Sequence, residues 1–235
     1  MGALHEGGDG CTLLRMKNSD LHEKIIHYSE GEELFNRWTH GLAALLAIAG
    51  AAQLIGLALA GGDVWRIASV CVYGFAMVTF YCLSTAYHSV REPYLRYLFR
   101  ILDHASIYLM IAGSYTPFAL VTLRGVWGWW LFGLVWGLGI LGAVQKVFAA
   151  HRLPYLGPLL YLGLGWMVLF AYKPLSASLA ANGLMLLFAG GIAYTVGVLF
   201  YAWDRLPFNH AIWHLFVMTG SACHFAAIFY YVTPL

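Results

Sequence analysis

The sequence predicts an all-α membrane protein with seven transmembrane helices, and three observations support this fold class. Of the 235 residues, 61% are hydrophobic and only 10% are charged, and the mean hydropathy is +0.70. A soluble domain carries about 25% charged residues, so this composition indicates a protein that resides in a bilayer. The other two observations are a series of seven uncharged stretches and an uneven distribution of basic residues between alternate loops.

The seven uncharged stretches each have room for the roughly 20 apolar residues that a helix needs to cross a bilayer. They span residues 38–62, 67–90, 104–123, 125–145, 153–172, 174–203 and 206–235. We expect a cytoplasmic segment at 1–38 and a seven-helix transmembrane domain at 39–235. The stretch at 174–203 is expected to be one helix preceded by a short polar segment. Because residues 1–38 lack an apolar core of signal-peptide type, insertion is expected to rely on the first helix.

The distribution of Lys and Arg predicts the orientation of the helices, because positive charge stays on the cytoplasmic side. Ten basic residues fall on one side: Arg15, Lys17, Lys24, Arg37, Arg91, Arg96, Arg100, Lys146, Arg152 and Arg205. Three fall on the other: Arg66, Arg124 and Lys173. We therefore expect a cytoplasmic N-terminus and an extracytoplasmic C-terminus. The end of helix two and the starts of helices three and seven would then all lie at the cytoplasmic face.

Three features concern how the helices pack or meet the lipid. Pro117 lies inside the third helix and is expected to kink it, because proline removes a helical hydrogen bond. Residues 91–102 alternate arginines with aromatic and aliphatic residues, which predicts a short amphipathic link at the anionic inner leaflet. Gly133 and Gly137 permit close helix packing, either inside the bundle, which is the favoured interpretation, or in a homodimer through helix four.

A few ionisable groups at the helix ends form a metal-ligand pattern. An ionisable group near the membrane core is costly and is therefore a candidate functional residue. His210 and His214 lie four residues apart, so they share one helix face and can offer two imidazoles to one ion. Ser84 and His88 share a face in the same way, and His88 would be the third ligand. Three histidines with one open position are typical of catalytic zinc, so zinc is the predicted cofactor.

The predicted catalytic residues are Asp103 and Ser84. Asp103 could orient a ligand histidine or act as general base and acid. Ser84 is too weak an acid to be a good ligand, but it could hold a water molecule or donate to a developing oxyanion. The residue after the first histidine of the pair is alanine, so the HExxH metalloprotease class is excluded. Glu32 and Glu33 are interpreted as a capping or juxtamembrane cluster, with a functional carboxylate as the minority interpretation.

The remaining histidines are given structural interpretations. His224 lies ten residues, or about 15 Å of helix, beyond His214, so it is expected to make a polar contact between helices. His40 and His104 are alternative ligands or supports for the ligands, although each alone is more often structural. Four others are expected at the surface: His5, His22, His27 and His151. The four cysteines have no paired spacing, which argues against a disulfide framework, and the net charge of +2 gives no indication of nucleic acid.

Four segments resemble the bacterial hemolysin III proteins, within the progestin and adipoQ receptor family. They are EELFNRWTHG (32–41), STAYHS (84–89), LDHASIYLMIAGSYTPF (102–118) and NHAIWHLFVMTGSACHF (209–225). The resemblance implies a seven-helix fold with a cytoplasmic N-terminus, and zinc held by three histidines that correspond to His88, His210 and His214. The family's serine and aspartate correspond to Ser84 and Asp103. Alkaline ceramidases look similar more distantly, through the same set of residues.

Two kinds of function are therefore expected, both in a multi-pass protein of the bacterial inner (plasma) membrane with membrane lipids as partners. The first is a zinc-binding protein of membrane or lipid homeostasis. The alternative is a zinc-dependent amide hydrolase whose substrate is a ceramide-like membrane lipid. An ion conductor is a weaker third class, because the middle of the membrane offers His224 and little else that ionises. The resemblance does not extend to hormone-receptor function, and nothing in the sequence supports a lytic pore.

Overall fold

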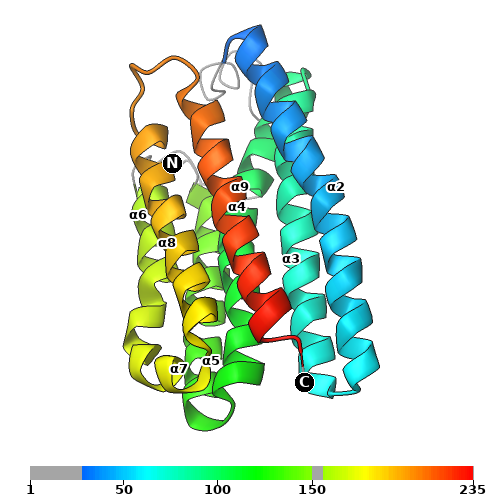
Figure 1. Cartoon of the computed structure of the whole chain (residues 1–235). Helices are drawn as coiled ribbons and strands as arrows, with labels where there is room; N and C mark the ends of the chain where they lie inside the picture. The colour runs from blue at the N-terminus through cyan, green and yellow to red at the C-terminus, as the bar shows by residue number, and fades with distance from the viewer. Residues whose placement is uncertain (1–27, 150–155, 235) are drawn as a thin grey trace, which may run out of the picture.

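The described part of the chain, residues 28–149 and 156–234 of a computed structural model, is a bundle of α-helices (Figure 1). Seven helical spans in it are long and apolar enough to cross a membrane, which confirms the predicted fold class. The elements are α2 (Glu30–Gly61), α3 (Val64–Ser89), α4 (Pro93–Pro117), η2 (Phe118–Leu123), α5 (Gly125–Ala149), α6 (Leu156–Gly165), η3 (Trp166–Ala171), α7 (Tyr172–Ser178), α8 (Ala181–Tyr201) and α9 (Asn209–Tyr231).

Short turns with capping side chains reverse the chain between the first three spans. Gly62 ends α2 with a φ of 70°, a left-handed conformation that glycine adopts without steric cost. Asp63 then begins α3 by accepting the backbone N–H groups of Trp65 and Arg66. Glu92 caps α4 in the same manner, and a proline follows it in the first turn of the helix, where its missing amide proton is not needed.

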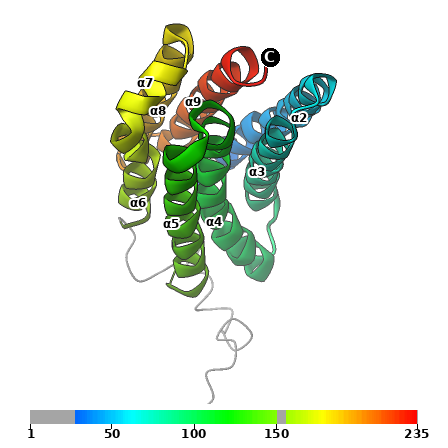
Figure 2. The same cartoon turned by 90° about the horizontal axis from the view of Figure 1, so that it is seen from below.

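The spans pack as neighbours in chain order, and the last helix closes the bundle. α2 packs on α3, α3 on α4 and α4 on α5, while α9 packs on both α8 and α2; Figure 2 shows this arrangement along the bundle axis. α2, α4 and α9 begin, and α3 ends, at the upper end in Figure 1. We call this the histidine end, since the residues of the predicted metal pattern belong to these helix termini. The predicted convergence of the three termini is therefore present in the fold.

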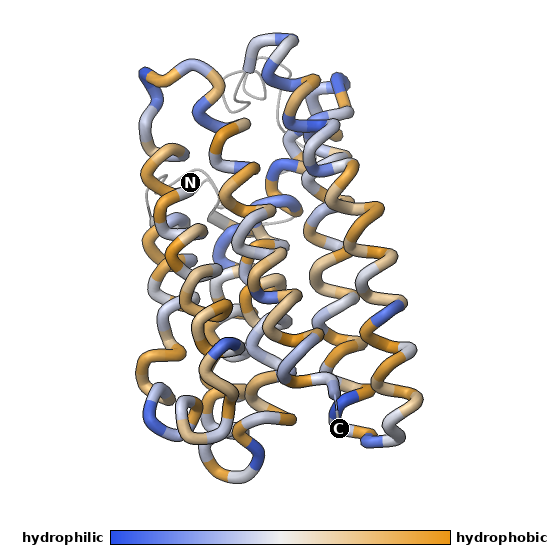
Figure 3. The backbone as a smooth tube through the Cα atoms, in the orientation of Figure 1, coloured by the Kyte–Doolittle hydropathy of each residue, from blue (hydrophilic) through white to orange (hydrophobic). Residues whose placement is uncertain are grey.

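The outer faces of the spans are apolar along most of their length. Large side chains such as Leu45, Phe75 and Leu199 are exposed there, and Figure 3 shows hydrophilic positions gathered mainly toward the two ends of the bundle. A water-soluble monomer rarely exposes so continuous an apolar surface. These faces suit contact with lipid acyl chains, in agreement with a multi-pass membrane protein.

Three helices, α2, α3 and α4, begin earlier than the uncharged stretches predict, and for α2 and α4 the difference is large. Ser29 accepts the backbone N–H of Glu32, so α2 begins at Glu30 and the last residues of the expected cytoplasmic segment are helical. The predicted separate link at 91–102 is wrong, because α4 begins at Pro93 and continues into the third span. Asp103 consequently lies in the third turn of α4 rather than at the start of a helix. A count of uncharged residues cannot detect a helix that begins with charged turns.

The boundary between the fifth and sixth spans also differs from the prediction. Pro174 lies inside α7, the last turns of the fifth span, and the chain reverses only after Ser178, so the sixth span begins at Ala181. Proline is tolerated in the first turn of a helix, and here it does not mark a boundary. The regular α-helix α4 ends at Pro117 and continues as the π-helix η2, and the kink expected there stays a prediction.

The two glycines of α5 face away from the other spans. A Cβ atom added to Gly133 or Gly137 would meet no atom within 4 Å, and both residues are exposed. The favoured interpretation, close packing inside the bundle, is therefore wrong for this pair. Homodimerisation through this face stays a prediction.

Candidate metal centre

Three buried histidines meet at the histidine end of the bundle. His88 lies in the last turn of α3, and His210 and His214 lie in the first two turns of α9. Their exposed fractions are 3%, 2% and 0%, and one ligand nitrogen from each lies within 4.8 Å of the other two. The structure thus brings together all three residues predicted to bind the metal ion.

The hydrogen bonds of these rings leave one nitrogen of each free for an ion. Nδ1 of His88 lies 2.8 Å from Glu33, and Nδ1 of His210 lies 3.0 Å from the hydroxyl oxygen of Tyr28. The Nε2 atoms of both rings, and both nitrogens of His214, are buried without a partner among the described residues. A buried polar atom left without a partner costs about 1–3 kcal/mol. Three neutral imidazoles with free nitrogens suit zinc and other late transition metals, so the residues fit the predicted ion.

Glu33 is an orienting residue that the sequence analysis placed in a capping or juxtamembrane cluster. Its second carboxylate oxygen forms an ion pair with Arg96 on α4. A carboxylate on Nδ1 fixes the tautomer and direction of a ligand histidine. One of the two roles considered for Asp103, orientation of a ligand, is therefore filled by Glu33 at His88.

Tyr28 supports the second ligand from the segment just before α2. Its ring lies 4.7 Å from that of His210, centroid to centroid. Burial raises the pKa of the Tyr28 phenol well above its ordinary value, so the oxygen stays a neutral hydroxyl. It can then accept the Nδ1 proton of His210, which leaves Nε2 unprotonated for an ion. No sequence pattern singled out Tyr28.

Ser84 and Asp103 lie beside the three histidines. They are 1% and 4% exposed, and the Asp103 carboxylate is within hydrogen-bonding range of the Ser84 hydroxyl. His104 follows Asp103 in the sequence. Its Nδ1 donates to the backbone carbonyl of Arg100 at 2.7 Å, so this nitrogen is not available to bind an ion. The two predicted catalytic residues are thus adjacent to each other, and Ser84 is one turn from His88.

The buried face of α2 carries a polar stripe toward α9. Glu32, Asn36 and His40 are spaced by four residues and are all buried. The Glu32 carboxylate lies beside the backbone of His210 and Ala211 at the start of α9. This 4-residue spacing of polar residues in an apolar helix is the signal that could have identified α2 as part of the site.

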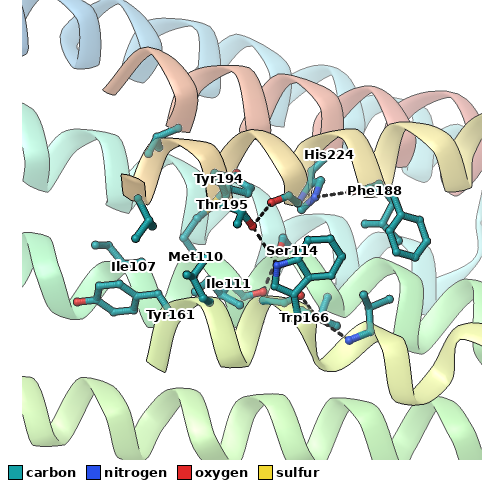
Figure 4. Close-up of a pocket in the computed structure, with 18 of the residues that line it drawn as sticks. Ile107, Met110, Ile111, Ser114, Tyr161, Trp166, Phe188, Tyr194, Thr195 and His224 are labelled. Carbon is teal, nitrogen blue, oxygen red and sulfur yellow. Dashed lines mark hydrogen bonds between the residues drawn. The ribbon is translucent and has the colours of Figure 1, made fainter. Parts of the chain in front are cut away.

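A cavity lies inside the bundle, and Figure 4 shows residues that line it. Its volume is about 120 Å³, and its lining is mostly aliphatic and aromatic. Trp213, one of its walls, lies 5.0 Å from the ring of His210 and 5.4 Å from that of His214. Phe80, another wall, lies 5.8 Å from His40. Trp213 and Phe80 thus line the cavity and lie next to histidines at the metal centre.

His224 lines the cavity at a distance from the metal centre. Its Nε2 donates to the backbone carbonyl of Leu187 on α8 at 3.1 Å, so the predicted polar contact between helices is confirmed. The histidines expected at the surface, His5, His22, His27 and His151, lie outside the described residues.

The fold and site together define a class: seven-span membrane proteins with a buried three-histidine cluster at one end. Residues 28–225 match the family model described as Haemolysin-III related, and the chain belongs to this family. It is 46% identical over 203 residues to Hemolysin-3 of Bacillus cereus, covering 86% of this chain and 93% of that protein. It is 44% identical over 200 residues to the Hemolysin-3 homolog of Bacillus subtilis (strain 168), covering 85% and 94%.

A human protein is more distantly similar. The chain is 30% identical over 207 residues to the Monocyte to macrophage differentiation factor of Homo sapiens, covering 86% of this chain and 84% of that protein. These matches confirm the family resemblance seen in the sequence, including its extension to the progestin and adipoQ receptor family. No solved structure matches the chain.

Proposed function

We propose that the chain binds a zinc ion through His88, His210 and His214 and acts in membrane or lipid homeostasis. The observation that carries the proposal is the set of buried imidazole nitrogens within 4.8 Å of one another that lack partners among the described residues. A zinc ion held there would polarise a carbonyl group and lower the pKa of a water molecule. The bacterial relatives support a location in the bacterial inner (plasma) membrane.

Metal analysis of detergent-purified protein tests the ion. We expect about one zinc per wild-type chain, as in sites with three histidine ligands, and none in the double variant His210→Ala, His214→Ala. The variant His224→Ala, which removes a buried histidine away from the cluster, is the matched control and should keep its zinc. Well-folded wild-type protein without bound metal would refute the site.

The second candidate function is hydrolysis of an amide-linked, ceramide-like membrane lipid. It is favoured by the position of Asp103 next to Ser84, one turn from the ligand His88, and by the apolar cavity whose wall Trp213 lies next to His210 and His214. Asp103 would accept a proton during attack and return it to the leaving amine. Ser84 lies within hydrogen-bonding range of this carboxylate, and an acyl chain would occupy the cavity after entering from the lipid.

A lipid panel separates the hydrolase from a non-enzymatic regulator. Zinc-loaded wild type should release fatty acid from ceramides or N-acyl lipids, and zinc-loaded Asp103→Asn should be slower by about 10²–10⁴-fold. If the zinc-loaded wild type leaves the whole panel intact, the hydrolase proposal fails. In a regulator the ion mainly joins α3 to α9, so His88→Ala should then lower the thermal stability of the bundle.

A further inference from the structure

His40 lies in the metal centre although it is not one of its three ligands. It is fully buried on α2, and its Nδ1 lies 2.7 Å from the hydroxyl oxygen of Ser84 on α3. Its ring stacks on that of His214, with centroids 3.5 Å apart and planes inclined by 11°. One side chain therefore contacts both a predicted catalytic residue and a predicted ligand.

The hydrogen-bonding capacity of Ser84 fixes the direction of these bonds. A hydroxyl group has a single proton and can also accept hydrogen bonds. Asp103 is within hydrogen-bonding range of the same hydroxyl. When this carboxyl group is ionised it can only accept, so that Ser84 donates to Asp103 and accepts the Nδ1 proton of His40. The result is a chain from His40 through Ser84 to Asp103 that links α2, α3 and α4.

The geometry of the stack argues against His40 as a fourth ligand. The cluster with nitrogens within 4.8 Å comprises His88, His210 and His214 and leaves His40 out. The rings of His40 and His214 are nearly parallel and stacked, so their nitrogen lone pairs lie in two parallel planes. The lone pairs of two ligands of one ion must instead point to the same position. With Nδ1 committed to Ser84, His40 supports the ring of His214 by stacking contact, while its Nε2 is buried without a partner among the described residues.

We propose that His40 is a positioning residue whose Nδ1 proton holds the Ser84 hydroxyl on the Asp103 carboxylate. The carboxylate is then fixed toward the metal centre before any lipid arrives, and its orientation costs nothing at the moment of reaction. In this arrangement the Ser84 proton is committed to Asp103, so Ser84 acts by holding the carboxylate. The inference deepens the proposed function, because it assigns the residue that orders the predicted acid–base pair.

The protonated nitrogen of His40 can be observed directly by NMR of full-length protein labelled with ¹⁵N-histidine. We expect a protected Nδ1–H signal that is absent from His40→Phe and from His40→Asn, which assigns it. The signal should shift in Ser84→Ala and also in Asp103→Asn, although Asp103 is not bonded to His40. The internal control is His224, whose Nε2 donates to a backbone carbonyl and whose signal should be unchanged.

Two outcomes of the NMR experiment would overturn the proposal. A His40 ring protonated at Nε2 alone would mean that Ser84 donates to His40 and that the chain runs the other way. An Nδ1–H signal that does not shift in Asp103→Asn would mean that the chain of hydrogen bonds ends at Ser84.

Zinc content separates this inference from the proposed function. His40→Phe keeps the stacked ring and His40→Asn keeps a donor near Nδ1, and each folded variant should retain the zinc content of the wild type. Loss of zinc from both would make His40 a ligand and refute the positioning role. If instead the wild type binds no zinc but shows an Nδ1–H signal that shifts in Ser84→Ala and Asp103→Asn, the proposed function fails. The chain of hydrogen bonds from His40 to Asp103 is then still supported.

Discussion

Glu33 and His88 lie on different helices and form the hydrogen bond that orients one histidine of the metal centre. Nδ1 of His88 lies 2.8 Å from one carboxylate oxygen of Glu33, and Arg96 pairs with the other. A single carboxylate thus joins α2, α3 and α4. Because a ring held at Nδ1 presents Nε2 in a fixed direction, Glu33 can influence a bound ion without touching it.

The variant Glu33→Gln should bind zinc about 10–100-fold more weakly than wild type, the usual loss when such a support is changed. The amide keeps the size of the side chain but loses the charge that attracts Arg96 and polarises His88. Competition with a chelator of known affinity measures the effect. Glu30→Gln, an exposed change in the first turn of the same helix, is the matched control. Equal affinities in the two variants would limit Glu33 to a structural role.

The seven spans and the meeting of the ligands could be predicted because membrane physics constrains both strongly. A helix must be long and uncharged to cross a bilayer, and antiparallel neighbours place alternate helix ends together. His88 and His210 are 122 positions apart in the sequence, yet the topology alone puts them at one end. The cytoplasmic assignment of that end stays a prediction from the charge count.

The residues that orient the ligand histidines could not be predicted. Which side chain faces a ligand depends on the rotation of each helix about its own axis, and a residue pattern does not specify that rotation finely enough. Glu32 and Glu33 are adjacent, so they differ by about 100° around a helix of 3.6 residues per turn. Glu32 lies beside the start of α9, whereas Glu33 orients His88. Nothing in the sequence distinguishes these two roles. Likewise, the charged start of α4 concealed that Asp103 lies well inside a helix.

Filling the cavity should remove bound lipid and leave the metal centre intact. Val198 lines the cavity and is replaced by a much larger side chain in Val198→Trp. The neighbouring Leu199 is exposed on the outer face, so Leu199→Trp is a matched control of the same size. We expect Val198→Trp to retain several-fold less co-purified lipid by mass spectrometry, with unchanged zinc. Equal lipid content in both variants would show that the cavity is not a lipid site.

The homodimer predicted for helix four can be tested at the exposed glycines of α5. Close approach of two helices requires small residues at their contact, so Gly133→Leu with Gly137→Leu should convert a dimer to a monomer. Light scattering in detergent measures the mass of the complex. Gly56 is an exposed glycine on α2 with no atom within 4 Å of an added Cβ, and Gly56→Leu is the control. A wild type that is already monomeric would exclude this dimer.

Asp63 gives the end of the bundle opposite the histidines a dependence on pH. Desolvation raises the pKa of its carboxyl group, but the hydrogen bonds from the backbone of Arg66 and Trp65 and the ion pair with Arg124 outweigh it and lower the pKa overall. The Arg124 ion pair measures 2.5 Å. A lowered pKa means that the ionised group stabilises the fold above its ordinary pKa of about 4. This stability is lost as the pH falls through the pKa of the folded state.

The variant Asp63→Asn should therefore have a lower melting temperature than wild type at pH 7, and the difference should shrink below about pH 4. Asparagine also caps helices well, so the change isolates the charge from the cap. Asp204→Asn alters the net charge equally at an exposed position and should leave the melting temperature nearly unchanged. Zinc content should match wild type in both, because Asp63 lies at the far end of the bundle. A melting difference that persists undiminished into acid would assign the effect to the cap instead of the ion pair.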